Sequence, residues 1–169
     1  MKQTCSSILI LGIDPGLQRC GWGLVASEGS RLSHVAHGVV RPKTSADLAD
    51  RLAVLLVEIE AVIATHRPHE ASIEETFVNS NARAALALGQ ARGVTLAACA
   101  RAKLPVAEYS PRTIKKSLVG TGSADKDQVA FMVRRLLPTA GDVGADAADA
   151  LAAALCHAAH GGLRRRVGG

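Results

Sequence analysis

Four acidic residues stand at positions where their carboxylates could act together. Asp14 directly follows the apolar run at residues 8–13, and Glu74 ends a second short apolar segment. Asp146 and Asp149 are three residues apart in a helical pattern, so they lie about 60° apart around the axis and share one face. If the two apolar segments are neighbouring parallel strands, Asp14 and Glu74 lie side by side at the edge where open α/β sheets bind ligands.

Four carboxylates in one cleft would repel one another unless divalent cations neutralised them. A ligand set made only of oxygen atoms favours Mg²⁺ or Mn²⁺ over zinc. Two such ions in one site can bind the attacking water and the leaving oxygen of a phosphodiester. Each acid taken alone also has an ordinary explanation, because Asp-Pro-Gly is a common turn and an acidic residue at a strand end or a helix start is often a surface charge.

The charge distribution also indicates a nucleic-acid substrate. The chain has a net charge of +5, and residues 101–135 hold eight basic and three acidic side chains, whereas residues 136–163 hold three aspartates and no Lys or Arg. A basic segment suits a polyanion because neutralising phosphates releases counterions. The acidic helix that follows would repel the same polyanion unless a cation lay between them. Two unrelated solvated faces are the alternative explanation.

The elements that must position these residues follow from the apolar pattern. Strands are predicted at residues 8–13, 21–26, 32–40, 71–76 and 105–109. Helices are predicted from Thr44, as the N-cap, to residue 67, and then at residues 82–101, near 111, and at 125–137 and 145–160. This order predicts an α/β fold with a five-stranded mixed sheet, three antiparallel strands followed by two parallel ones, and helices on both faces.

Length and composition limit the other classes of protein. With 169 residues, 48% of them hydrophobic, we expect a single domain over residues 1–163 and a basic, disordered tail over 164–169. No apolar stretch approaches the roughly 20 residues that span a bilayer, so we expect a cytoplasmic protein with no membrane partner. The four cysteines lack metal-ligand spacing, so we expect them reduced and mostly buried. The six histidines are expected at the surface or at helix ends.

Four motifs, in this order along the chain, resemble the RuvC family of Holliday junction resolvases. They are Leu-Gly-Ile-Asp-Pro-Gly at residues 11–16, Ile-Glu-Glu-Thr-Phe at 73–77, Leu-Gly-Gln-Ala-Arg-Gly at 88–93 and Ala-Asp-Ala-Ala-Asp-Ala-Leu-Ala at 145–152. The resemblance extends from about residue 8 to residue 160. It implies a ribonuclease-H-like fold, a homodimer, and Mg²⁺-dependent cutting of four-way DNA junctions by paired symmetric nicks in recombination and repair.

The resemblance also implies roles for individual residues. The catalytic and metal-binding acids of the family correspond to Asp14, Glu74, Asp146 and Asp149, with two Mg²⁺ ions per site that Mn²⁺ can replace. Phe77 is expected to stack on an unpaired base at the crossover. Lys115 and Lys126 match lysines that approach the scissile phosphate, and Arg112 and Lys116 are expected to contact the DNA backbone at a distance. The implied partners are the four-way junction, a second copy of the chain and the RuvA-RuvB branch-migration complex.

Two other functions are compatible with the same sequence motifs. A noncatalytic relative would bind junctions without cutting them. An actin- or sugar-kinase-like ATP-binding lobe would use the Gly-Ile-Asp-Pro-Gly loop for phosphate, although Leu17 stands where such a loop carries Ser or Thr. The helix at residues 82–101, rich in small residues, is the expected dimer interface because glycines permit close helix packing.

Overall fold

The computed structural model describes residues 7–75 and 81–167, with side chains described through residue 161. Its five strands are β1 (Ile8–Asp14), β2 (Cys20–Glu28), β3 (Arg31–Val40), β4 (Glu70–Glu74) and β5 (Val106–Tyr109). They form one sheet in the order β3-β2-β1-β4-β5. β1, β2 and β3 pair antiparallel, whereas β4 pairs parallel with β1 and with β5. The predicted mixed sheet is therefore confirmed.

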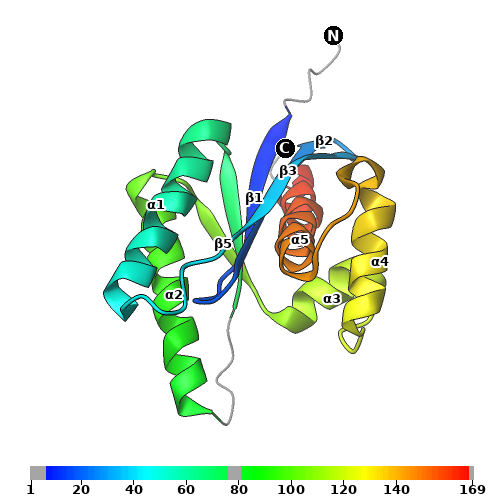
Figure 1. Ribbon diagram of the computed structural model, residues 1–169. Helices are drawn as coiled ribbons and strands as arrows, with labels where there is room; N and C mark the ends of the chain where they lie inside the picture. Colours follow the sequence, from blue (N-terminus) through cyan, green and yellow to red (C-terminus); the bar gives the residue numbers. More distant parts are fainter. Residues whose placement is uncertain (1–6, 76–80, 168–169) are drawn as a thin grey trace.

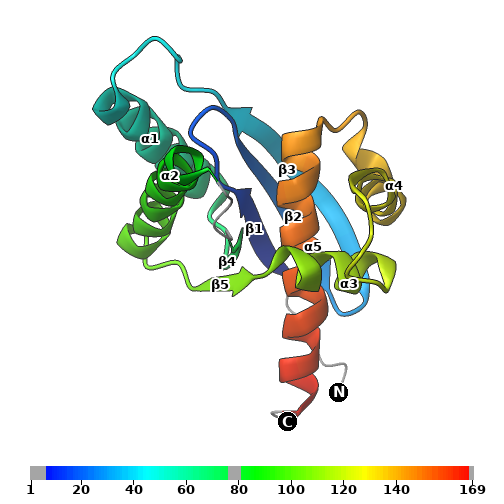
Figure 2. The same cartoon turned by 90° about the horizontal axis from the view of Figure 1, so that it is seen from below.

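Helices cover both faces of this sheet, as expected (Figure 1). α1 (Leu48–His66) and α2 (Ala82–Arg101) pack together on one face. The other face carries α3 (Pro111–Val119), α4 (Lys126–Leu136) and α5 (Ala145–Val167), with the short 3₁₀ helix η1 (Pro138–Ala140) between the last two. Figure 2 shows α5 lying along the sheet with α3 and α4 on its outer side.

The alternation of side chains along each strand divides the core into two layers. Ile10 and Val25 point toward α5 and belong to a core cluster with buried residues of α3 and α4. Their neighbours Leu11 and Leu24 point to the other face and pack with residues of α1 and α2. Both faces of the central strands are therefore buried, which explains why β1 is apolar throughout except at Asp14.

Two predicted helix limits differ from the structure. Thr44 is not the N-cap of α1, because residues 43–46 form a turn closed by a hydrogen bond from the Ala46 amide to the Lys43 carbonyl. Asp47 occupies the N-cap position instead, without a capping side-chain hydrogen bond. At the other end of the chain, the apolar pattern predicts that α5 ends near residue 160, whereas the helix extends to Val167. It therefore includes part of the segment expected to form a separate tail.

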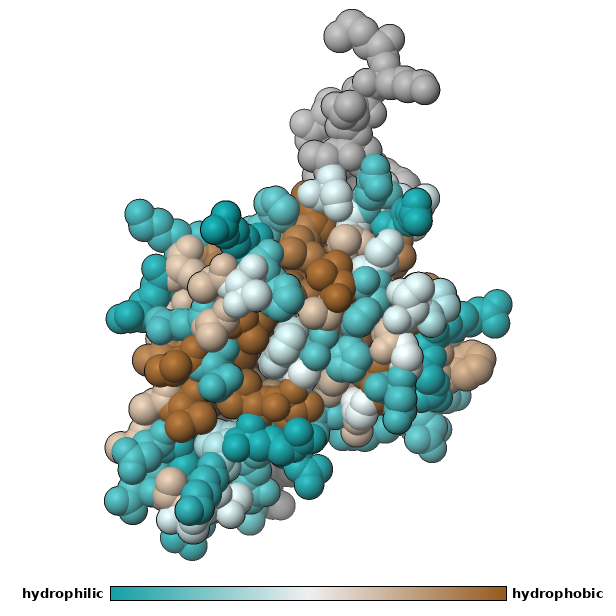
Figure 3. Space-filling view, turned by 45° about the horizontal axis from the view of Figure 1, so that its top comes forward, coloured by the Kyte–Doolittle hydropathy of each residue, from teal (hydrophilic) through white to brown (hydrophobic). Residues whose placement is uncertain are grey.

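Three of the four cysteines lie within the described residues. Cys20, Cys99 and Cys156 are buried free thiols, and Cys5 lies outside the described residues. Within the described ranges, no helix combines the length and the apolar character needed to cross a bilayer. On the face in Figure 3, polar side chains surround smaller apolar patches.

Candidate active site

Close contact between α5 and the sheet brings the acidic residues of the helix to the strands. Gly12 of β1 lies against the carbonyl oxygen of Ala150, and a side chain at position 12 would overlap that oxygen. Gly21 of β2 lies in the same way against the carbonyl oxygen of Asp146. The hydroxyl of Ser72 donates a 2.8 Å hydrogen bond to the carbonyl oxygen of Ala153, so β4 also holds the helix. The start of α5 is therefore fixed beside the end of β1.

The strand register places the other two acids together. β1 and β4 are parallel neighbours, with Ile13 opposite Ile73, so Asp14 and Glu74 follow as the next residues of the two strands. The carboxyl ends of parallel strands meet at one edge of the sheet. The sequence motifs around Asp14 and Glu74, which are 60 residues apart in the chain, thus meet at one point of the fold.

A cavity of about 320 Å³ opens where these elements meet. Its charged lining residues are Asp14, Glu74, Asp149, Lys115 and Lys126. Pro111, Ile114, Val129 and Ala152 complete its wall. The cavity thus holds three of the four predicted acids and both predicted lysines. Asp146 is not part of this lining, and its carboxylate lies 3.9 Å from the guanidinium of Arg19, whose side chain is exposed.

The carboxylates of the cavity destabilise one another in their ionised forms. Burial, followed by the charges of Asp149, Glu74 and Asp146, raises the pKa of Asp14 from 3.8 to about 7. Burial and the charge of Asp149 also raise the pKa of Glu74. The pKa of Asp149 is raised by burial, although Lys126 acts in the opposite direction. Perturbed carboxyl groups in a cleft are a common property of functional sites.

Lys126 is the cation closest to these acids. Its ammonium nitrogen lies 3.6 Å from Oδ2 of Asp149, and 83% of its side chain is exposed. Lys126 is the first residue of α4, whose N-terminus is fixed by a capping box between Asp125 and Gln128. The ammonium group therefore stands at the mouth of the cavity, between the acids and the solvent.

Comparison with known proteins identifies the family. The family model for crossover junction endodeoxyribonuclease RuvC matches residues 10–157. The chain belongs to the RuvC family. It is 58% identical over 158 residues to the RuvC crossover junction endodeoxyribonuclease of Caulobacter vibrioides, with 94% of each chain covered. It is 55% identical over 161 residues to that of Hyphomonas neptunium, covering 95% of this chain and 96% of the relative.

Solved structures support the same assignment. The structure of T. thermophilus RuvC in complex with a Holliday junction substrate superposes with a TM-score of 0.87 at 32% identity, covering 93% of this chain and 96% of that one. The yeast mitochondrial Holliday junction resolvase, at 14% identity and a TM-score of 0.65, shares the fold. The expected ribonuclease-H-like fold is thus confirmed for this RuvC family member.

The donor set in the cavity fits hard divalent cations. It consists of carboxylate groups that have too little positive charge around them to balance their own negative charge. Carboxylate oxygens are the ligands that Mg²⁺ and Mn²⁺ prefer. Among the residues that the structure describes, no three His, Cys, Asp or Glu side chains form a ready-made metal-binding group. Three carboxylates nevertheless face one cavity, and cations between them would replace their mutual repulsion by attraction.

Two of the remaining predicted DNA-binding residues lie outside the cavity of this RuvC family member. Phe77 falls outside the described residues. Arg112 and Lys116 do not line the cavity of Asp14; they line a second hollow together with Thr113, Ser117 and His160. The lysines of α3 are therefore divided, because Lys115 faces the acids and Lys116 faces the second hollow.

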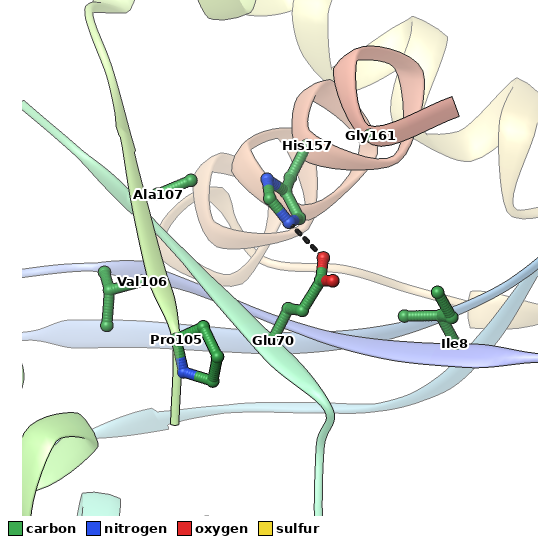
Figure 4. A pocket seen from close by; sticks show the side chains of 7 residues that line it. All are labelled: Ile8, Glu70, Pro105, Val106, Ala107, His157 and Gly161. Carbon is green, nitrogen blue, oxygen red and sulfur yellow. Dashed lines mark hydrogen bonds and ion pairs between the residues drawn. The ribbon is translucent and has the colours of Figure 1, made fainter. Parts of the chain in front are cut away.

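The expectation that the histidines lie at the surface or at helix ends is wrong for His157. His157 lies on α5 with only 12% of its side chain exposed, and its Nε2 donates a 2.6 Å hydrogen bond to Glu70 at the start of β4. Its Nδ1 lies 2.8 Å from the hydroxyl of Tyr109 on β5. Figure 4 shows His157 and Glu70 pointing toward each other beside a cavity of about 300 Å³. The separation of these residues in the chain explains why spacing alone could not find them.

Proposed function

We propose that this chain is a structure-specific endonuclease that resolves four-way (Holliday) DNA junctions by paired symmetric nicks, in DNA recombination and repair. The observation that carries the proposal is the cavity in which Asp14, Glu74 and Asp149 meet Lys115 and Lys126. It occurs in a chain whose relatives are named crossover junction endodeoxyribonucleases. Acids that hold cations next to lysines that hold a phosphate suit phosphodiester hydrolysis.

Asp14, Glu74, Asp146 and Asp149 would hold the metal ions, which we take to be two Mg²⁺ per site with Mn²⁺ as a substitute. Bound there, the ions would supply an activated water and charge stabilisation for the leaving oxygen. The protein itself must present its acids ionised. Because the pKa of Asp14 is raised to about 7, this carboxyl group is only partly ionised at neutral pH, and a bound cation or a higher pH favours the ionised form.

Lys115 and Lys126 would position the scissile phosphate. Both line the cavity, and Lys126 reaches its mouth from the first turn of α4. In the free protein the Lys126 ammonium partly compensates the charge of Asp149. When cations take over that compensation, the ammonium would be available for a charge-assisted hydrogen bond to a phosphate oxygen.

A homodimer provides two such sites for the two equivalent strands of a junction. We propose α2 as the interface, since Leu86 on this helix has 64% of its surface exposed and space is open beside Gly89 and Gly93. The RuvA-RuvB branch-migration complex is the further proposed partner. We also propose that this chain acts in the cytoplasm.

The deciding experiment uses a synthetic four-way junction and a linear duplex made from the same arm sequences. We expect wild-type protein to nick the junction symmetrically with Mg²⁺ or Mn²⁺ and to leave it intact in EDTA. Asp14→Asn should bind the junction and fail to nick it. Tight junction binding by the wild type without cleavage under any divalent ion would favour the noncatalytic alternative. Wild-type cleavage rates in Asp14→Asn would reject the assigned site.

A further inference from the structure

A second hollow beside α3 gathers positive charge that the active site does not use. It measures about 580 Å³ and is lined by Arg112, Thr113, Lys116, Ser117 and His160. Arg112 and Lys116 are exposed and one turn apart on α3, so their side chains leave the helix on the same face. In the described ranges, neither of them forms an ion pair with a carboxylate. Two cations held side by side without a counter-charge repel each other and favour an anion between them.

The ring of His160 completes the wall of the same hollow. Its Nδ1 lies 2.8 Å from the carbonyl oxygen of Cys156. A carbonyl only accepts hydrogen bonds, so Nδ1 carries a hydrogen and Nε2 is the ring nitrogen left for another partner.

The loop that follows α3 fixes the position of Arg112. Gly122 lies so close to the Arg112 side chain that a Cβ at position 122 would overlap Cγ and would stand 3.1 Å from Nε. The contact involves the stem of the arginine as well as its end, so a larger residue at position 122 would move the whole side chain. Arg112 is thus held toward the hollow by the chain itself.

We propose that this hollow binds a non-scissile phosphodiester group of the DNA substrate through Arg112 and Lys116. α3 separates the hollow from the catalytic cavity, because Pro111, Ile114 and Lys115 line one and Arg112, Thr113, Lys116 and Ser117 line the other. The two hollows share no lining residue, so the bound phosphate is a different one from the phosphate that is cut.

This site deepens the proposed function and rests on it, since it assumes a DNA substrate. Its contribution is to fix the direction of a DNA arm as it leaves the active site. Phosphate contacts set the register and orientation of a protein on DNA without reading the sequence. The occupied hollow would hold the arm at α3 while Lys115, about 100° around the same helix from Lys116, meets the scissile phosphate.

The test measures binding in EDTA, by fluorescence anisotropy, of a four-way junction and of a linear duplex across a range of salt concentrations. Arg112→Ala, Lys116→Ala and the double variant are compared with the wild type. Arg31→Ala, which removes an exposed arginine at the start of β3, is the matched control. If both cations bind one phosphate, the plot of the logarithm of the association constant against the logarithm of the salt concentration should be less steep by about one in the double variant. Its affinity for DNA should fall roughly tenfold.

The single variants should be strongly coupled, with either one causing most of the loss seen in the double variant. Gly122→Ala should cause a loss similar to that of Arg112→Ala, because it displaces the arginine.

Each outcome decides between the two proposals. A salt slope in the double variant equal to that of the wild type and of Arg31→Ala, on both DNAs, overturns the phosphate site even if junctions are cut normally. A reduced slope in a protein that neither prefers nor cuts junctions supports the phosphate site and rejects the proposed function. Thermal unfolding of every variant, expected within a few degrees of the wild type, separates lost contacts from lost folding.

Discussion

The ammonium nitrogen of Lys126 lies 3.6 Å from the carboxylate of Asp149, across the mouth of the cavity that also contains Asp14 and Glu74. The pair joins the first residue of α4 to the acidic end of α5. Lys126 balances more of the negative charge in the cavity than any other described side chain, because it is the largest influence that lowers the pKa of Asp14, of Glu74 and of Asp149.

We therefore expect Lys126→Met to slow junction cleavage by about 10²-fold or more, in the range found for a lost electrostatic group in an active site. Binding of the junction in EDTA should weaken much less, since a single cation at an exposed site is removed. Single-turnover cleavage and anisotropy measure the two effects. Lys103→Met, at the start of the loop after α2, provides a control for the loss of one lysine charge. Equal losses in rate and affinity would argue against a role at the scissile phosphate.

Asp14→Asn should stabilise the metal-free protein at neutral and alkaline pH. The folded protein holds the Asp14 proton more tightly than the unfolded chain does, because the pKa rises from 3.8 to about 7. Ionisation of Asp14 therefore lowers the free energy of unfolding as the pH rises through this window, by at most about 1.4 kcal/mol per pH unit. Denaturant unfolding in EDTA at pH 8 should give a higher free energy of unfolding for the variant. At pH 4 the two proteins should be nearly equal, and a large difference there would contradict this explanation.

Divalent ions should bind more tightly as the pH rises. A cation competes with the proton on Asp14, whose pKa is about 7, and with the protons on Glu74 and Asp149, whose pKa values are also raised. At a subsaturating Mg²⁺ concentration, the cleavage rate should increase from pH 6 to pH 8. Saturating Mg²⁺ should move the rise in rate to lower pH. A pH profile that does not respond to the Mg²⁺ concentration would exclude this competition.

Phe77→Ala should reduce cleavage of the four-way junction while leaving its binding in EDTA little changed. The expectation depends on the family resemblance and on the stacking of an aromatic ring on an unpaired base. Phe77→Trp should retain most of the activity, since the larger ring also stacks. Fluorescence of 2-aminopurine placed at the crossover reports the unpaired base directly. Normal cutting by Phe77→Ala would show that the ring has another role.

His157→Phe should lower the free energy of unfolding by about 1–3 kcal/mol, because it leaves the partners of two partly buried hydrogen bonds unsatisfied. Those bonds join α5 to Glu70 and Tyr109 over 2.6 and 2.8 Å. Glu70→Gln should cost less, since its amide oxygen still accepts a hydrogen bond from Nε2. Urea unfolding of the three proteins checks the order. Equal stability of His157→Phe and the wild type would mean that these hydrogen bonds add nothing to the attachment of α5.

The limits of the strands and of most helices could be predicted from local patterns. Apolar alternation and turn residues depend on neighbours in the chain, so the strands before Asp14 and Glu74 were found within a few residues. Thr44 shows where this fails, because a turn at residues 43–46 took the place of the expected cap. Competing local hydrogen bonds of similar energy are difficult to rank without the surrounding structure.

The sequence by itself determined the order of the elements, the acidic and basic residues available for chemistry, and the resemblance of their motifs to the RuvC family. Only the tertiary structure decided which of those residues face the same space. The contact of Gly12 with Ala150 places Asp149 beside Asp14, while α3 directs Lys115 and Lys116 into two different hollows. It also revealed the bonds of His157 to Glu70 and Tyr109. Such contacts depend on how helices pack on a sheet, and packing joins residues that no local spacing relates.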